Sequence, residues 1–160
     1  MERRQWEIEL AACYGRVLRG LIALGNREAG EDAFHDALAA ALAPGTIERI
    51  ERADAWLYAV GVRYLRRSRW RARLDAPLAI LRGSLGPPTT QRLEVLELLD
   101  RLPRRQREIV IARFYLDLSY AQIARELGIS IGTATTTVSQ ALARLRKTGG
   151  EGATWNKAKS

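Results

Sequence analysis

The chain has 160 residues, 47% of them apolar, so it can bury the core of one medium-sized domain or two small ones and is not disordered by composition. Its formal net charge of +8 favours a polyanionic partner, with nucleic acid first and an acidic protein or membrane surface second. A generically basic protein remains the alternative. One cysteine, Cys13, excludes an intramolecular disulfide and a Cys-based zinc site. One histidine, His35, leaves no constellation for His-based metal or triad chemistry.

The first ten residues, "MERRQWEIEL", are charged and lack the apolar stretch of a signal peptide. No apolar run along the chain approaches the length of a membrane span. We therefore expect a soluble, cytoplasmic protein without membrane insertion. Cys13 stands within the apolar stretch "LAACYGRVL", which predicts a buried structural thiol.

Apolar residues recur with helical spacing almost throughout, and no alternating strand pattern of useful length appears. A first helix ends at Gly25, and Asn26 caps a second through "REAGEDAFHDALAAAL". Pro44 and Gly45 break that helix, and Asp54 is the expected cap of a third. The third helix presents one apolar face, formed by Trp56, Leu57, Val60, Tyr64 and Leu65.

The composition then changes. "APLAILRGSLGPPTTQ" holds three prolines and two glycines, which predicts a linker over residues 75–90. Helical signals resume with "LEVLELLDRL", which ends before Pro103, and continue through "RRQREIVIARFYL". We expect an all-α protein of two small helical domains, residues 1–74 and 91–148, joined by a flexible linker and followed by a flexible polar tail over residues 149–160.

The second domain has the pattern of a helix-turn-helix. Ser119 and Gln122 fit a capping box at the start of a short helix, Gly128 ends that helix, and Ser130 can cap the next one. Small and apolar residues fall where two helices must cross closely, namely Ile123, Ala124, Leu127, Ile129, Ala134, Val138, Leu142 and Leu145. An ordinary helical hairpin is the alternative.

The outer face of the last helix carries threonines where such helices often carry Lys or Arg. Threonine can bond a phosphate or a base edge, its methyl can touch a thymine methyl, and glutamine can pair with adenine. The candidate DNA-binding residues are Thr133, Thr135, Thr136, Thr137, Gln140, Arg144 and Lys147. A solvated face that never contacts DNA is the alternative.

The stretch "RYLRRSRWRAR", residues 63–73, contains six arginines and no acid. Arginines bind phosphates and aromatic rings stack on unpaired bases, so this basic helix suits single-stranded or melting DNA. Its candidate residues are Arg63, Tyr64, Arg66, Arg67, Arg69 and Trp70. A solvated helix end with Tyr64 in the core is the alternative. Upstream, Glu28, Asp32 and Asp36 share one face of the second helix, which suits a basic protein partner or simple solvation.

Three stretches together resemble the bacterial sigma factors of the extracytoplasmic-function type: "REAGEDAFHDALAAAL", "ADAWLYAVGVRYLRR" and "LPRRQREIVIARFYLDLSYAQIARELGISIGTATTTVSQALARLR". The resemblance implies a factor that binds core RNA polymerase through Glu31, Asp32 and Asp36 and directs it to promoters. It implies contact with the −10 element by residues 46–54 and the basic helix, and with the −35 element by the last helix. It also implies regulation by an anti-sigma factor.

Two other functions remain open. The chain could be a stand-alone helix-turn-helix regulator, or a sigma-like protein that sequesters an anti-sigma factor without binding DNA. Enzymatic activity is disfavoured because the acids are scattered and neither a phosphate-binding loop nor a metal-ligand spacing appears, so no cofactor or metal is expected.

Overall fold

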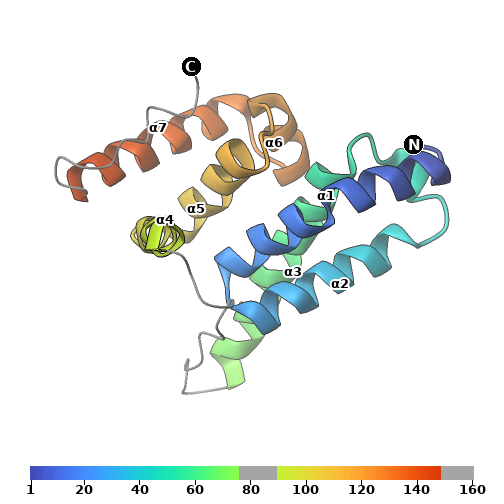
Figure 1. Cartoon of the computed structure of the whole chain (residues 1–160), viewed down its shortest axis with the longest axis horizontal. Helices are drawn as coiled ribbons and strands as arrows, with labels where there is room; N and C mark the ends of the chain where they lie inside the picture. The colour runs from blue at the N-terminus through green and yellow to red at the C-terminus, as the bar shows by residue number, and fades with distance from the viewer. Residues whose placement is uncertain (76–89, 149–160) are drawn as a thin grey trace.

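The computed structural model describes residues 1–75 and 90–148, with side chains over 1–68 and 95–147. The N-terminal half holds three α-helices and one short 3-10 turn, namely α1 (Arg3–Leu24), α2 (Arg27–Ala41), η1 (Ile47–Arg49) and α3 (Ala53–Asp75). Each of the three helices packs against the other two (Figure 1). Asn26 caps α2 as predicted, because its side-chain oxygen accepts a hydrogen bond from the Ala29 amide at 2.8 Å.

The C-terminal half consists of α4 (Thr90–Asp100), α5 (Arg104–Val110), the π-helical turn η2 (Ile111–Tyr115), α6 (Tyr120–Leu127) and α7 (Ile131–Thr148). α7 packs along α5 and α6 (Figure 1). Together with the N-terminal half, these elements make the described part of the chain all-helical, as the sequence predicted.

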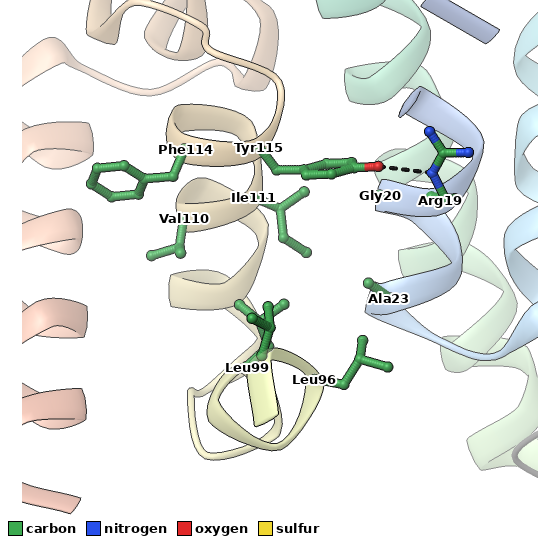
Figure 2. A pocket seen from close by; sticks show the side chains of 10 residues that line it. Arg19, Gly20, Ala23, Leu96, Leu99, Val110, Ile111, Phe114 and Tyr115 are labelled. Carbon is green, nitrogen blue, oxygen red and sulfur yellow. Dashed lines mark hydrogen bonds between the residues drawn. The ribbon is translucent and has the colours of Figure 1, made fainter. Parts of the chain in front are cut away.

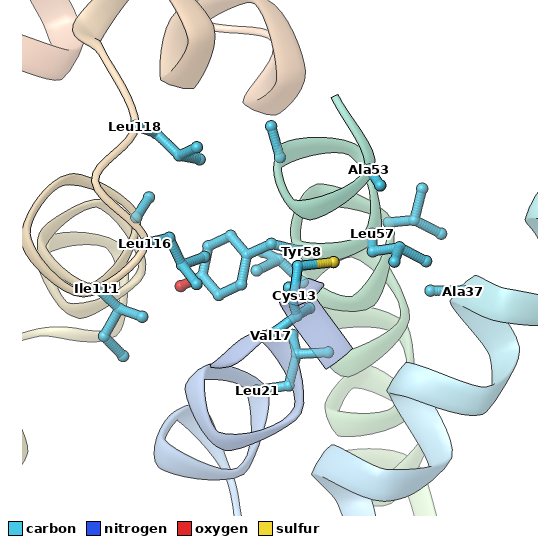
Figure 3. Close-up of a cluster of buried hydrophobic side chains, with 14 of the residues drawn as sticks. Cys13, Val17, Leu21, Ala37, Ala53, Leu57, Tyr58, Ile111, Leu116 and Leu118 are labelled. Atoms are coloured by element: carbon cyan, nitrogen blue, oxygen red, sulfur yellow. The ribbon is translucent and has the colours of Figure 1, made fainter. Parts of the chain in front are cut away.

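The two halves share a large apolar core, and a second, smaller cluster of Leu102, Val110 and Ala141 lies within the C-terminal half. Tyr58 of α3, which is 1% exposed, projects its ring toward Leu116 and Ile111 of the C-terminal half and lies near Cys13 of α1 (Figure 3). Leu118 belongs to the same buried cluster. Burial of these apolar side chains stabilises the contact between the halves, because each contributes on the order of 1.5–3 kcal/mol when it leaves water completely.

Two local predictions differ from the structure. Asp54 is not the cap of α3 but lies in its first turn, where it is buried and binds the guanidinium of Arg52 at 2.6 Å and the Ala55 amide at 2.7 Å. The helix expected after Pro103 does not stay α-helical to its end. Its last turn widens, and the Leu116 amide donates to the Ile111 carbonyl at 3.0 Å, five residues back. The linker and the tail lie outside the described residues.

Candidate DNA-binding surfaces and the interface between the two halves

The helix-turn-helix formed by α6 and α7 has the geometry that the sequence predicted. Ser119 and Gln122 form a reciprocal capping box at the start of α6. Gly128 ends α6 with φ 66° and ψ 42°, in the left-handed region that glycine adopts without strain. Ser130 accepts a hydrogen bond from the Thr133 amide at 2.9 Å, so it caps α7. Buried Ile123, Ala124, Ala134 and Val138 then close the angle between the two helices.

The outer face of α7 is open to solvent. Six of the seven candidate −35 residues are exposed and Thr137 is half-buried. The hydroxyls of Thr135 and Thr137 donate to the carbonyls of Ile131 and Thr133, at 2.8 and 2.7 Å. These hydroxyls therefore offer DNA mainly an acceptor oxygen and a methyl group. Among the hydrogen bonds of the described residues, none uses the hydroxyl of Thr136.

The basic helix, which is the C-terminal part of α3, differs from the outer face of α7 because two of its arginines contact the C-terminal half. Arg63 donates from Nη1 to the carbonyl of Glu126 in α6 at 3.2 Å, and Arg66 forms an ion pair with Glu108 of α5. Arg67 is exposed and Tyr64 is half-buried. The side chains of Arg69 and Trp70 lie outside the described residues. Two of the six candidate −10 residues are therefore held by the C-terminal half, an arrangement that the sequence did not predict.

Glu108 is the centre of this contact. Its side chain is only 1% exposed, and its carboxylate accepts from Arg66 of α3 and from Arg104 of its own helix, at 3.0 Å from Arg104 Nε. Arg105 lies 3.8 Å away. A buried carboxylate needs cations and hydrogen bonds to replace water, and here both halves supply them. The single acid in "RRQREIV" was a local signal of such a cluster, because Arg104 and Glu108 stand four residues apart.

Tyr58 adds a neutral contact at the same place. Its hydroxyl donates to the carbonyl of Glu108 at 2.9 Å. Burial raises the pKa of this hydroxyl well above its ordinary value, and the nearby Glu108 charge raises it further. Tyr58 therefore stays neutral and acts as a hydrogen-bond donor between the halves.

Further polar contacts join the halves at their two edges. Near the helix-turn-helix, Arg125 of α6 pairs with Glu51, and Arg52 donates to Gln122 Oε1 at 3.3 Å. At the other edge, Arg19 of α1 donates from Nε to the hydroxyl of Tyr115 at 3.0 Å (Figure 2).

An apolar pocket of about 270 Å³ lies beside the Arg19–Tyr115 contact, where α1 faces α4 and η2 (Figure 2). Its lining includes Ala23, Leu96, Leu99, Val110 and Phe114. The interface between the halves is thus closely packed around Glu108 and more open near α4.

The acidic candidates for polymerase binding, Glu31, Asp32 and Asp36, lie on α2. Asp32 and Asp36 are exposed and border a shallow hollow that also contains Tyr64 and Ser68. Glu31 is half-buried, and its carboxylate lies 3.9 Å from Arg27. Asp32 and Asp36 are therefore accessible to a basic partner in this conformation.

Within the described ranges, no three or more His, Cys, Asp or Glu side chains gather closely enough to hold a metal ion. None of the helices that the structure describes is both long and apolar enough to cross a membrane.

These features define a class of protein: over the described residues the chain is all-helical, and its C-terminal half carries a helix-turn-helix whose outer face is polar and exposed. Residues 92–145 match the family model described as Sigma-70, region 4. The chain is 35% identical over 108 residues to the RNA polymerase sigma-E factor of Streptomyces coelicolor, an alignment that covers 64% of this chain and 60% of that protein. The sigma-E factor of Streptomyces avermitilis is 34% identical over 101 residues, covering 59% and 56%.

Two solved structures share the fold. The first is the sigma factor RpoE in complex with the anti-sigma factor NepR from Bartonella quintana, with a TM-score of 0.70 and 23% identity over 90% of this chain and 96% of that one. The second is CnrH in complex with the cytosolic domain of CnrY, with a TM-score of 0.65 and 19% identity over 92% and 88%. The chain carries a sigma-70 region 4 domain and has the fold of a sigma factor, so the resemblance inferred from its motifs is confirmed.

Proposed function

We propose that the protein is a sigma-type transcription initiation factor, which binds core RNA polymerase and directs it to promoters. The observation that carries this proposal is the coincidence of the region 4 match, residues 92–145, with a well-formed helix-turn-helix whose α7 face is exposed. Sigma factors are non-enzymatic regulators, so the chain acts by binding rather than by catalysis.

In this proposal the chain divides into a domain over residues 1–74 for core polymerase and the −10 element, a linker, and a domain over residues 91–148 for the −35 element. Arg144 and Lys147 hold phosphates at the end of α7, while Thr136 and Gln140 face the bases. The basic helix of α3 contacts the −10 element. The exposed pair Asp32 and Asp36 supports a polymerase-binding face on α2.

Regulation by an anti-sigma factor is part of the same proposal. Both solved structures that share the fold were determined with such a regulator or with the cytosolic domain of a binding partner. The partner of this chain would be a protein of the same general kind.

The test is co-elution of the purified full chain with bacterial core RNA polymerase on a sizing column, which needs no knowledge of the promoter. We expect stoichiometric co-elution that is lost in the double charge reversal D32K/D36K. The matched control is E2K/E7K, which makes the same charge change at two exposed acids at the start of α1. A folded chain that never co-elutes would contradict the proposal.

Base reading by α7 has its own test. A duplex is first selected from a random-sequence pool by the wild-type protein, and T136A/Q140A is then measured on that duplex and on an unrelated one. We expect the variant to lose roughly 30-fold or more in affinity on the selected duplex, because it removes two base contacts worth about 1–3 kcal/mol each, and to lose little on the other. An equal loss on both duplexes would show that these side chains do not read bases.

A second candidate is a sigma-like protein that sequesters an anti-sigma factor without binding DNA. The hydroxyls of Thr135 and Thr137, which donate within α7, favour this reading because they leave the helix fewer donors for DNA. Specific duplex binding by the wild-type chain would exclude it.

A further inference from the structure

The apolar pocket beside the Arg19–Tyr115 contact has its polar groups gathered at one end. Side chains of α1, α4 and η2 form its walls, and Ala23, Leu96 and Ile111 face the same space (Figure 2). Among the described lining residues, Arg19 is the one charged residue and Tyr115 the one other residue with a polar side-chain group. The Arg19 Nε and the Tyr115 hydroxyl lie 3.0 Å apart, so both polar side chains meet at the same place. A pocket of this form suits a ligand with one polar group and an apolar body.

The polar end of the pocket favours an anion. Arg19 is exposed, and within the described part of the chain it forms no ion pair and donates from Nε alone, to Tyr115. Its two terminal nitrogens therefore remain available, in the planar arrangement that matches the two oxygens of a carboxylate. The Tyr115 hydroxyl accepts from Arg19, so its own hydrogen can be donated to the same ligand. One guanidinium balances one negative charge, which favours a carboxylate over a phosphate monoester with a charge near −2.

The apolar part of the pocket sets the size of the ligand. Its volume is about 270 Å³. An apolar cavity of roughly 150 Å³ accepts benzene, with six carbon atoms, so this pocket takes on the order of ten non-hydrogen atoms. Leu96, Leu99 and Phe114 offer no hydrogen bond to a polar substituent, so the body of the ligand must be hydrocarbon. Val95 and Phe114 are 42% and 37% exposed, and a hydrocarbon chain laid against them would remove apolar surface from water.

We propose that this pocket binds a small amphiphilic anion, namely a medium-chain carboxylate of about eight to ten carbon atoms. The carboxylate pairs with the terminal nitrogens of Arg19 and accepts from the Tyr115 hydroxyl, and the chain lies against Leu96 and Leu99. Because the ligand contacts α1, α4 and η2 at once, it stabilises the folded chain by mass action. The site is independent of the proposed function, since it involves neither polymerase nor DNA.

The probe is octanoate, titrated into the full chain while the methyl groups of alanine, leucine and isoleucine are followed by NMR. We expect saturable shifts of the methyl signals of Ala23, Leu96 and Ile111, with a Kd on the order of 1 mM or tighter for a ligand of this size. No saturation at about 10 mM would overturn the proposal. So would saturable shifts confined to methyl groups outside the pocket, because they would place the ligand elsewhere.

The anion end is tested with two other ligands of the same chain length, 1-octanol and octylammonium, and with the variant R19Q. We expect octanoate to bind roughly fivefold or more tightly than either, and R19Q to remove this advantage while its affinity for octanol stays unchanged. The matched control is R4Q, which removes the same charge from an exposed arginine near the start of α1. Equal binding of octanol and octanoate by the wild-type chain, or unchanged octanoate binding by R19Q, would overturn the assignment.

The apolar end is tested by filling it. A23F places a ring in the space that the hydrocarbon chain would occupy, whereas A12F places the same ring on the exposed side of α1. We expect A23F to lose binding of octanoate and of octanol by tenfold or more, and A12F to bind both as the wild type does. Octanoate binding by a folded A23F with wild-type affinity would overturn the proposal. If A23F fails to fold by circular dichroism, the methyl shifts and R19Q still decide.

These assays contain neither polymerase nor DNA, so their failure is separable from failure of the proposed function. Co-elution with core polymerase combined with no octanoate binding would remove the ligand site and leave the initiation factor. Octanoate binding at the pocket methyl groups combined with no co-elution would keep the ligand site and remove the initiation factor.

Discussion

At Gly30, α2 lies against the backbone of α1, and replacement of this glycine by alanine should destabilise the fold. A Cβ at Gly30 would lie 2.6 Å from the Cα of Ile22 and 2.7 Å from its amide nitrogen. Both atoms are backbone, so no side-chain rotation can relieve the overlap. α2 would have to move away from α1 by roughly 0.8 Å before the contact became an ordinary one.

Two effects of opposite sign set the magnitude. Alanine is favoured over glycine inside a helix by about 1 kcal/mol. Overpacking in a close-packed interior costs about 1–3 kcal/mol, and the upper part of that range applies where backbone must shift. We therefore expect G30A to lower the free energy of unfolding by about 1–2 kcal/mol, and the midpoint of thermal unfolding by about 2–4 °C for each kcal/mol.

Gly15 provides the matched control on the same pair of helices. The three atoms nearest to a Cβ placed there all belong to the guanidinium of Arg19, with Nη1 at 3.3 Å, and that side chain can move. G15A should therefore stabilise the protein by up to about 1 kcal/mol, through helix propensity alone. Urea unfolding followed by circular dichroism measures both variants. A G30A protein as stable as G15A would refute the reasoning from the close approach of the two helices.

Three further outcomes can be checked on the same protein. Y58F keeps the ring but loses the hydroxyl that donates to Glu108, so urea unfolding should show a loss of about 1 kcal/mol, and no change would mean that this bond does not stabilise the contact between the halves. Burial, helped by the charge of Asp54, raises the pKa of the Cys13 thiol to about 11. The folded protein should therefore react with a thiol reagent at pH 8 about 100-fold more slowly than the unfolded chain, and equal rates would contradict the burial. S119A removes the cap of α6 and should cost about 1 kcal/mol in the same unfolding assay, whereas an unchanged midpoint would show that the capping box contributes nothing.

The features that could be predicted from the sequence are local ones. Asn26, Ser119 and Ser130 cap their helices through bonds that reach three residues along the chain, and Gly128 ends α6 for a reason that lies in its own backbone. The apolar stripe of α7 follows from the helical period alone. The all-helical fold and the helix-turn-helix needed no other information.

The contact between the halves could not be predicted, because it joins residues far apart in the chain. Arg66 and Glu108 are separated by 42 positions, and nothing near Arg66 indicates that a buried carboxylate will meet it. A run of arginines signals affinity for anions in general, whether the anion is a phosphate or a glutamate. The chemistry that makes the candidate −10 residues suit DNA phosphates therefore also suits a carboxylate of the same chain.

On the outer face of α7, the sequence predicted which side chains are exposed but not where their hydroxyl groups donate. The spacing placed Thr133, Thr136 and Gln140 on one exposed side, which the structure confirms. It did not indicate that Thr135 and Thr137 would donate their hydroxyl hydrogens within the helix. Short polar side chains have a backbone acceptor within reach in any helix, so their availability to a ligand depends on the rotamer.

The sharing of one core between the halves also sets an order of events during synthesis. α1, α2 and α3 can pack on one another as soon as residue 75 has left the ribosome, but the ring of Tyr58 then has no cover from Leu116 and Ile111. An apolar surface is thus exposed until the last helices emerge, and exposed apolar surface promotes aggregation. A chain truncated after α3 should therefore be less soluble than the complete one, although it contains every residue of its own three-helix bundle.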